Sequence, residues 1–308
     1  MLEKEKRRFG LVGTITQDVI TQASGRVLSG LGGILYQAAG LCGLGRDVAL
    51  YSQVGQDFLP QIRSLIDRWP TCDSAGIRIV PGPGNRVFLH YPEEGERVEV
   101  LESHVPPLQP DELLTDLPRT GFLILVINSG FDITLRDWRR VVLRAECPIW
   151  LDVHSLVLTP DLHTARRYRP LPEWRDWASG VTYLQANLKE VAAMLGEPER
   201  IPSRERLDRF GETALDLGIK GVFITLGSEG ILVMMPGSSR KIASPRAGEV
   251  VDTTGCGDIM CAGTAALLQT GADPVEAAGF GAELASEAAR VSGVERTYDL
   301  IRKRVFRA

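Results

Sequence analysis

Residues 250–263 read VVDTTGCGDIMCAG, and this stretch is the most informative of the chain. Glycines on both sides of Cys256 let the backbone approach a ligand closely. The run that follows predicts a helix, whose first N–H groups are unpaired and lie at the positive end of its dipole. Asp258 would lie in the first turn, beside a bound oxyanion. A carboxylate there is unfavourable unless it has a chemical role, and taking a proton from an attacking hydroxyl group is such a role.

A lone Gly-x-Gly-Asp pattern is also typical of an ordinary helix start, where Asp is common. The longer form DTTGCGD at 252–258 is more specific. It resembles the second signature of the PfkB/ribokinase family of carbohydrate (sugar and nucleoside) kinases, usually written DTTGAGD, with Cys256 in place of Ala. The resemblance implies that Asp258 is the general base. It also implies that charge on the transferred phosphoryl group is held by the backbone N–H groups of Gly255, Cys256 and Gly257.

A second segment, at 32–57, resembles the first signature of the same family. Gly32 and Gly33 open a run of small residues, and a strand-like run then ends in Val-Gly-Gln-Asp. Read alone, this segment is equally a glycine-hinged core helix. The family usually has Asn where this chain has Gln37, which carries the same donor and acceptor on a longer arm. The resemblance implies that Gly32, Gly33 and Gln37 hold the acceptor.

Three shorter matches fall in the family's order along the chain. GTITQD at 13–18 resembles the family opening and makes Asp18 the candidate for binding two acceptor hydroxyls. NLKE at 187–190 resembles the NxxE motif and implies that Glu190 organises Mg²⁺ and phosphate through water. TLGSEG at 225–230 resembles the strand end that lines the nucleotide. The implied nucleotide-binding residues are Asn187, Thr225, Gly227 and Gly230, and the implied ligand of a monovalent cation such as K⁺ is Asp252.

The composition excludes several other classes. The chain has 308 residues, 44% of them hydrophobic, and a net charge of −4 without a basic block, so we expect a sizeable core and no nucleic-acid partner. No apolar run approaches the roughly 20 residues of a membrane helix. Five cysteines without CxxC spacing and a charged start, MLEKEKRRFG, predict a reducing cytoplasm. The four histidines form no zinc pattern, and the P-loop motif GxxxxGK[ST] is absent.

Strand-like and helix-like runs alternate, which predicts a three-layer α/β fold. Continuous apolar runs such as FLILVINS and PIWLDVHS are typical of strands covered on both faces of a parallel sheet. We expect strands at 9–15, 48–54, 122–128, 148–153, 181–186, 221–227 and 230–235. We expect helices at 33–44, 60–69, 135–145, 188–195, 204–217, 258–270 and 274–292. Ligands of such sheets bind beyond the carboxyl ends of the strands. Four polar or glycine positions fall at such ends: Asn128, Asp152, Asn187 and Gly227.

Two short alternating runs, 86–91 and 97–101, predict a hairpin around residues 92–96. The resemblance implies a single ribokinase-like kinase domain over 1–308, with a mostly parallel central sheet. It also implies a small β-sheet lid, formed by about 16–31 and 85–103, which covers the substrate and mediates a homodimer. The alternative is a surface hairpin without substrate contact.

The sequence therefore predicts ATP-dependent phosphorylation of a hydroxyl group on a sugar, nucleoside or cyclitol. One alternative is a catalytically weak relative that serves as a ligand sensor or interaction protein, which Gln37 and Cys256 would allow. The other is an NAD-dependent oxidoreductase, for which Gly30-Leu31-Gly32-Gly33 is the only support. In that case Leu35 would occupy the third glycine position of GxGxxG, and no strand directly precedes the turn.

Overall fold

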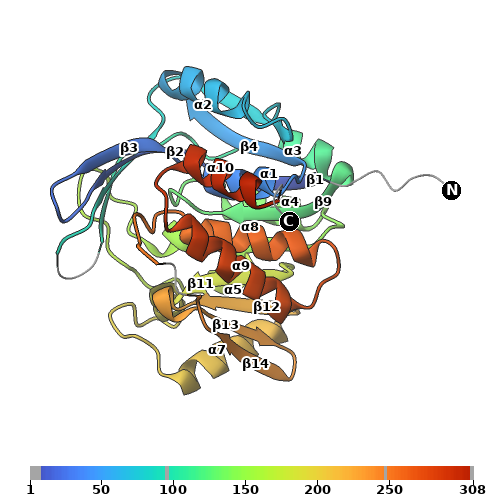
Figure 1. The fold of residues 1–308 in the computed structure, drawn as a ribbon. Helices are drawn as coiled ribbons and strands as arrows, with labels where there is room; N and C mark the ends of the chain where they lie inside the picture. The colour runs from blue at the N-terminus through green and yellow to red at the C-terminus, as the bar shows by residue number, and fades with distance from the viewer. Residues whose placement is uncertain (1–7, 94–96, 246–247, 306–308) are drawn as a thin grey trace.

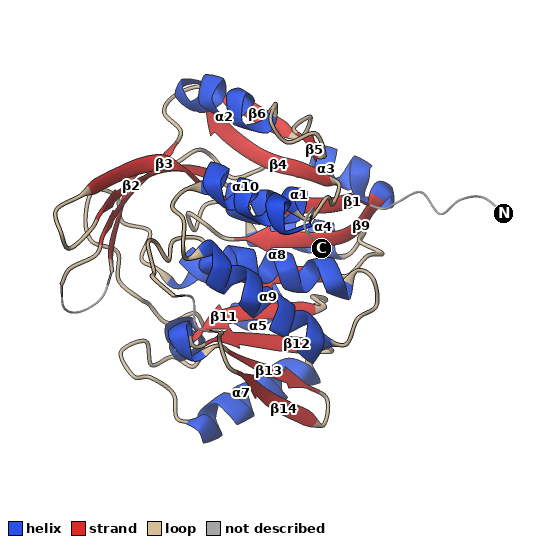
Figure 2. Ribbon diagram, viewed as in Figure 1, coloured by secondary structure: helices blue, strands red, loops and turns tan. Residues whose placement is uncertain are grey.

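The computed structural model describes residues 8–93, 97–245 and 248–305. They form a large central sheet with helices on both faces and a small sheet that projects from one side (Figures 1 and 2). This arrangement confirms the predicted three-layer α/β/α class with a separate small sheet. Residues 94–96 of the expected hairpin turn and the first seven residues of the charged start lie outside the described residues.

The large sheet has ten strands within the described residues, in the order β14-β13-β12-β11-β10-β9-β1-β4-β5, with β6 also paired to β4. It is parallel except at one edge, where β13 runs antiparallel to β12 and β14. Its strands are β1 (Arg8–Val12), β4 (Val48–Gly55), β5 (Cys72–Asp73), β6 (Ile77–Val80), β9 (Thr120–Val126), β10 (Ile149–Asp152), β11 (Tyr183–Asn187), β12 (Gly221–Thr225), β13 (Ile231–Met235) and β14 (Ser238–Ile242).

Helices cover both faces of this sheet. The helices are α1 (Leu35–Gly43), α2 (Leu59–Ile66), α3 (Asp111–Asp116), α4 (Leu135–Val142), α5 (Trp174–Ala178), α6 (Leu188–Met194), α7 (Arg204–Asp216), α8 (Cys256–Leu268), α9 (Pro274–Ala288) and α10 (Val294–Val305). Successive residues of a strand point to opposite faces, so each apolar strand feeds two cores. In β9, Leu123 and Leu125 join the core under α3 to α7, whereas Phe122 and Ile124 join the core under α1, α2 and α8 to α10.

The small sheet has the order β3-β2-β7-β8, with β2 (Ile15–Thr21), β3 (Val27–Gly33), β7 (Asn85–His90) and β8 (Val98–Ser103). The β2–β3 and β7–β8 pairs are antiparallel, which confirms the predicted hairpin, and β2 and β7 are parallel. Alternate residues face the main body. Asp18 and Glu99 are therefore buried, while Phe88 and Val98 on the opposite face are each 40% exposed.

The sequence and the structure differ most at chain turns. The strand expected at 9–15 is two strands, because the chain turns at Gly13, where φ is +153° and a Cβ would lie 2.5 Å from the Val126 carbonyl oxygen. The helix expected at 274–292 ends at Ala288, and Gly293, with φ of +85°, precedes the unpredicted α10. The predicted start of α9 is confirmed, since the Asp273 side chain accepts hydrogen bonds from the backbone N–H groups of residues 275 and 276.

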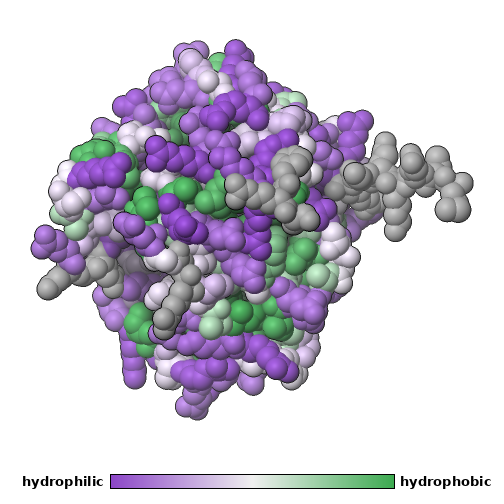
Figure 3. All heavy atoms as spheres, viewed as in Figure 1, coloured by the Kyte–Doolittle hydropathy of each residue, from purple (hydrophilic) through white to green (hydrophobic). Residues whose placement is uncertain are grey.

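The visible surface is mainly hydrophilic, with several separate hydrophobic patches (Figure 3). Across the described ranges, none of the helices combines the length and the apolar character that crossing a membrane requires. All five cysteines are free thiols.

Candidate active site

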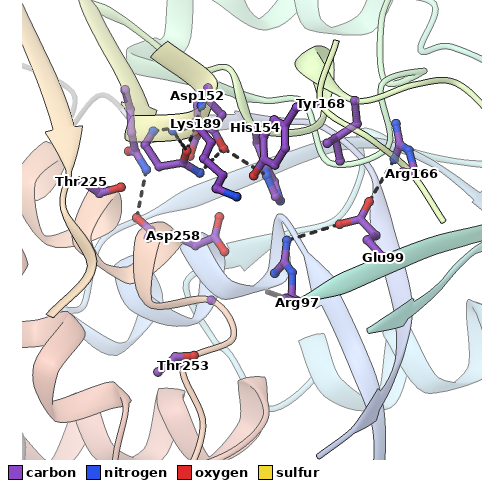
Figure 4. Close-up of a pocket in the computed structure, with 16 residues that line it drawn as sticks. Arg97, Glu99, Asp152, His154, Arg166, Tyr168, Lys189, Thr225, Thr253 and Asp258 are labelled. Atoms are coloured by element: carbon purple, nitrogen blue, oxygen red, sulfur yellow. Dashed lines mark hydrogen bonds and ion pairs between the residues drawn. The ribbon is translucent and has the colours of Figure 1, made fainter. Parts of the chain in front are cut away.

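A cavity of about 480 Å³ opens at the carboxyl ends of the central strands (Figure 4). Asp152 ends β10, Asn187 ends β11 and Thr225 ends β12, and all three side chains line it. The start of α8 forms another wall. The sequence-predicted residues on this cavity are Asn187, Glu190, Thr225, Gly255, Gly257 and Asp258. The strand-end rule thus brings together Asp152, Asn187 and Thr225, which lie far apart in the sequence.

A smaller cavity of about 60 Å³ lies between the small sheet and the start of α8. Asp18 and Gly33 line it, together with Thr16, Tyr36 and Asn128. Five residues line both cavities, so the two spaces adjoin: Arg97, Glu99, His154, Gly255 and Asp258. We refer below to the larger cavity and the smaller cavity.

The turn before α8 depends on glycine for two different reasons. Gly255 has φ of +78°, and a Cβ there would collide with the Tyr36 ring. Gly257 has no such constraint, because the nearest heavy atom to a Cβ would be Gln185 Nε2 at 3.6 Å. Since no neighbouring side chain excludes a Cβ at Gly257, the open space above it is free for a ligand to approach the backbone.

Cys256 lies within this turn but does not line either cavity. Its thiol donates a hydrogen bond to the Ala285 carbonyl oxygen on α9, at 3.5 Å. Burial, with Asp252 and Asp258 nearby, raises the pKa of this thiol to about 12. The side chain that replaces the usual Ala therefore points away from the cavities, and only its backbone N–H belongs to the turn.

Asp258 lies in the first turn of α8 as predicted. Burial raises the pKa of its carboxyl group to about 6, although the positive charge of His154 and a hydrogen bond from Gln37 act in the opposite direction. Gln37 Nε2 donates that bond to Asp258 Oδ1. Gln37 is fully buried and does not line either cavity, so its expected contact with the acceptor stays a prediction. In the structure, Gln37 instead holds the Asp258 carboxylate through this hydrogen bond.

Asp18 lies on β2, opposite Gly30 of β3, and faces the smaller cavity. Burial raises the pKa of the Asp18 carboxyl group to about 6, against the effect of a hydrogen bond from Thr16. A Cβ at Gly32 would collide with this carboxylate. Gly32 therefore leaves room for Asp18, whereas Gly33 lines the cavity itself.

Asn187 and Glu190 form a capping box at the start of α6. Glu190 Oε2 accepts a hydrogen bond from the Asn187 backbone N–H at 2.8 Å, and Glu190 Oε1 lies 3.8 Å from His154 Nδ1. Burial disfavours the charged imidazole, but the Glu190 carboxylate outweighs it and the pKa of His154 rises to about 9. Burial, followed by the charge of Glu190, raises the pKa of Asp152. Two buried carboxylates and one imidazolium thus face the larger cavity.

Besides Gly32, Gln37 and Cys256, three more predicted residues line neither cavity. Gly227 and Gly230 belong to the turn after β12, where φ is +61° and +103°. Asp252 is buried in the turn before α8, where Oδ1 accepts a hydrogen bond from the Thr254 backbone N–H at 2.9 Å and Oδ2 accepts one from the Ser292 hydroxyl at 2.7 Å. Among the described residues, no cluster of three or more His, Cys, Asp or Glu side chains is suited to hold a metal ion.

Several residues of the site were not predicted. Gln185 on β11 accepts a hydrogen bond from the buried Trp150 indole at 3.1 Å and donates one to the Gly257 carbonyl at 3.3 Å, which ties the core to the turn. His154 has φ of +32°, uncommon for a residue other than glycine. It lies two residues after Asp152, the last residue of β10, and this position near a strand end was the available signal. For Arg166 no local signal pointed to the site, because its partner Glu99 is 67 residues away in the sequence.

The comparisons with known proteins agree with this geometry. The family model described as pfkB family carbohydrate kinase matches residues 162–299. The chain is 36% identical over 94 residues to the bifunctional protein HldE of Alkalilimnicola ehrlichii, which covers 30% of this chain and 19% of that protein. It is 26% identical over 190 residues to the ribokinase of Arabidopsis thaliana, which covers 61% of this chain and 46% of that protein. The matched segments thus span less than half of these relatives.

The structural likeness extends over the whole chain. The structure of Arabidopsis thaliana ribokinase complexed with ribose and ATP superposes with a TM-score of 0.77 at 20% identity, covering 97% of this chain and 98% of that one. The fold is therefore ribokinase-like. The family match over residues 162–299 and the ribokinase-like fold together confirm the resemblance to the PfkB family of carbohydrate kinases.

Proposed function

We propose that this chain transfers the γ-phosphoryl group of ATP to a hydroxyl group of a small polyhydroxy acceptor, with Asp258 as the general base. The observation that carries the proposal is the position of Asp258, which lines both cavities at the start of α8. Its pKa of about 6 leaves the carboxylate ionised at neutral pH and basic enough to accept a proton. Gln37 fixes one carboxylate oxygen, so the other is available to the acceptor hydroxyl.

The smaller cavity is the proposed acceptor site. Asp18 would accept hydrogen bonds from two hydroxyl groups of a polyol, since an ionised carboxylate only accepts. Asn128, which also lines the cavity, can both donate and accept. The backbone at Gly32 and Gly33 would complete the site. Polar groups of this kind suit a sugar, nucleoside or cyclitol.

The larger cavity is the proposed site of ATP. The N–H groups of Gly255, Cys256 and Gly257 at the start of α8 would hold the charge that develops on the transferred phosphoryl group. Asn187 and Thr225 line the wall next to this turn, and the nucleotide would continue from them toward Gly227 and Gly230. A protein held in a closed form around both ligands would exclude water, so that the phosphoryl group reaches the acceptor.

Magnesium fits the same cavity. Burial, followed by the charge of Glu190, raises the pKa of Asp152, and a cation beside the two carboxyl groups would offset the repulsion between them. Glu190 would hold Mg²⁺ through water, and the ion would neutralise charge on the ATP oxygens. For K⁺ at Asp252 the fit is weaker, because both carboxylate oxygens already accept hydrogen bonds within the chain. That cation stays a prediction.

The small sheet is the proposed lid and homodimer surface. Its face away from the cavities exposes three apolar side chains, Val27 at 59%, Phe88 at 40% and Val98 at 40%. Covering them with a second copy would remove apolar area from water. Sedimentation velocity of the wild type and of Phe88→Asp tests this. We expect a dimer mass for the wild type and a monomer mass for the variant, and a monomer mass for both would argue against the dimer.

The function is tested by ADP release with Mg-ATP and a panel of sugars, sugar phosphates, nucleosides and cyclitols. We expect at least one acceptor to raise ADP release well above the rate without acceptor. ATP binding with no acceptor-dependent release across the panel would instead favour the ligand-sensor alternative. No ATP binding at all would contradict the assignment of the larger cavity.

A further inference from the structure

The junction between the two cavities is where a transferred phosphoryl group must pass, if the proposed function holds. Of the five residues that line both cavities, Asp258 is the proposed base and Gly255 belongs to the proposed anion-binding turn. The other three are Arg97, Glu99 and His154. Two of these are cations, and neither has a role in the mechanism described so far.

Glu99 of β8 is shared by two arginines. Its Oε1 lies 3.0 Å from Arg166 Nη1 and its Oε2 lies 3.3 Å from Arg97 Nη2. The Arg166 side chain is fully buried and also donates from Nε to the Thr159 carbonyl at 2.8 Å. Arg166 therefore neutralises Glu99 from the protein side. With two guanidinium groups on one carboxylate, the trio carries a net charge of +1, and Arg97 is the member with its side chain 34% exposed (Figure 4).

The other cations near the junction are balanced differently. His154 Nδ1 lies 3.8 Å from the carboxylate of Glu190. Lys189 lines only the larger cavity, and its Nζ lies 5.5 Å from the centre of the Tyr168 ring. The charge of Arg97 affects a carboxyl group on each side of the junction, Asp18 and Asp258. Burial raises the pKa values of Asp18 and Asp258, and the charge of Arg97 partly offsets both increases. The surplus positive charge thus lies between the acceptor-side carboxylate and the base.

Arg97 is held in place by the small sheet. It directly precedes β8, and it hydrogen-bonds with Tyr91, the residue after β7. The Tyr91 hydroxyl lies 3.2 Å from Thr254 Oγ1, in the turn before α8. The contact joins the sheet that carries Asp18 to the turn that carries Gly255.

We propose that Arg97 is a catalytic residue that contacts the phosphoryl group during its transfer, opposite the N–H groups of the α8 turn. This rests on the proposed function. In the step, the acceptor oxygen forms a bond to the γ-phosphorus and the bond from that phosphorus to the bridging oxygen of ADP breaks. ADP leaves with the electron pair, and the hydroxyl proton goes to Asp258. Negative charge spreads over the three remaining phosphoryl oxygens, and a planar guanidinium can donate to two of them.

The test compares Arg97→Ala and Arg97→Lys with Arg86→Ala. Arg86 is an arginine of the same sheet that pairs with Asp57 at 3.0 Å and lines neither cavity. With a neutral acceptor from the panel, we expect kcat of Arg97→Ala to fall about 100-fold, as for loss of one transition-state donor. KM for the neutral acceptor should change little. Arg97→Lys should recover part of kcat, and Arg86→Ala should retain wild-type kcat.

Unchanged kcat in Arg97→Ala would overturn the proposal. So would an effect confined to KM for acceptors that carry a phosphate or carboxylate, because Arg97 would then bind the acceptor's own anion. A second measurement does not depend on turnover: calorimetric titration with pyrophosphate in Mg²⁺ should show binding that Arg97→Ala weakens about 10-fold and Arg86→Ala leaves intact. Equal binding in all three proteins would remove the assignment of Arg97. Failure of the wild type to release ADP with any acceptor would instead remove the proposed kinase function.

Discussion

The larger and the smaller cavity share a wall but are built in different ways. Much of the larger one is formed by the carboxyl ends of neighbouring parallel strands and by the starts of α6 and α8, so these residues come from short contiguous motifs, while Arg97, Glu99 and Arg166 reach it from other segments. The smaller one forms only where the small sheet meets α8 and α1, and its wall depends on contacts between distant segments. The comparison indicates that the proposed phosphate-binding surface follows largely from local chain geometry, whereas the proposed acceptor pocket needs the packed molecule.

The largest effect is expected at the shared wall. Asp258→Asn should lower kcat at least about 100-fold, because the amide cannot take the acceptor proton. The Asn carbonyl oxygen can still accept the hydrogen bond from Gln37, so we expect a folded protein with unchanged ATP affinity. Acceptor-dependent ADP release and ATP titration measure the two properties. Near-wild-type turnover would show that Asp258, which lines both cavities, is not the general base.

A second pair of variants separates ligand contact from chain geometry within the larger cavity. Gly257→Ala meets no protein atom closer than 3.6 Å and lies in the first turn of α8. Replacing Gly by Ala at a compatible position should stabilise the protein by about 0.4 to 1 kcal/mol. The added methyl group would displace the phosphoryl group, and a displacement of this size costs roughly 100-fold in kcat.

Gly255→Ala is the matched control for that variant. Its φ of +78° and the Tyr36 ring leave no room for a Cβ, so the protein should be less stable than the wild type. Thermal unfolding and turnover of both variants distinguish the two outcomes. A fully active Gly257→Ala would mean that no ligand approaches the backbone there.

A smaller effect, specific to the other cavity, is expected from Asp18→Asn. An ionised acceptor of hydrogen bonds is worth about 1.5 to 3 kcal/mol, so its loss should raise KM for the acceptor roughly 10- to 100-fold. ATP affinity should be unchanged, because Asp18 does not line the larger cavity. Steady-state kinetics with each substrate varied in turn measures both. An equal loss of affinity for ATP would contradict the division between the cavities.

The smallest effect is the dependence on pH. The pKa values of Asp18 and Asp258 are both raised to about 6, so activity should be half-maximal near pH 6 and fall as the carboxylates become protonated below it. The stability of the folded protein depends on pH in the opposite sense to activity. A raised pKa in the folded state contributes stability below the unfolded value of about 4, and this contribution is lost as pH rises through about 6. Asp258→Asn should therefore gain thermal stability relative to the wild type as the pH rises from about 4 to about 6. A pH-independent difference would contradict the burial of this carboxyl group.

Much of the larger cavity could be predicted because its signals are local. The turn at 255–258, the capping box of Asn187 and Glu190 and the strand end at Asp152 each follow from a few consecutive residues and the rule that ligands bind at strand ends. The layers of the fold followed from apolar runs, since a strand with apolar residues at every position must be covered on both faces.

The remainder depends on contacts that no local pattern encodes. Gln37 reaches Asp258 across 221 residues, and Glu99 reaches Arg166 across 67. The direction of Arg97 follows from how the small sheet packs, which alternation along one strand does not determine. The strand β14 has the polar sequence SSRKI at the edge of the sheet, where no apolar pattern is required. The turn at Gly13, which divides the predicted first strand, is required by packing against Val126.

The division of the site into an ATP side and an acceptor side is tested most directly by binding to proteins that cannot turn over. Asp258→Asn, alone and combined with Asp18→Asn or with Gly257→Ala, would be titrated calorimetrically with a non-hydrolysable ATP analogue and with the acceptor found in the panel. We predict that the Asp18 change weakens only acceptor binding and that the Gly257 change weakens only nucleotide binding. Loss of both ligands in each double variant, or of neither, would contradict the account.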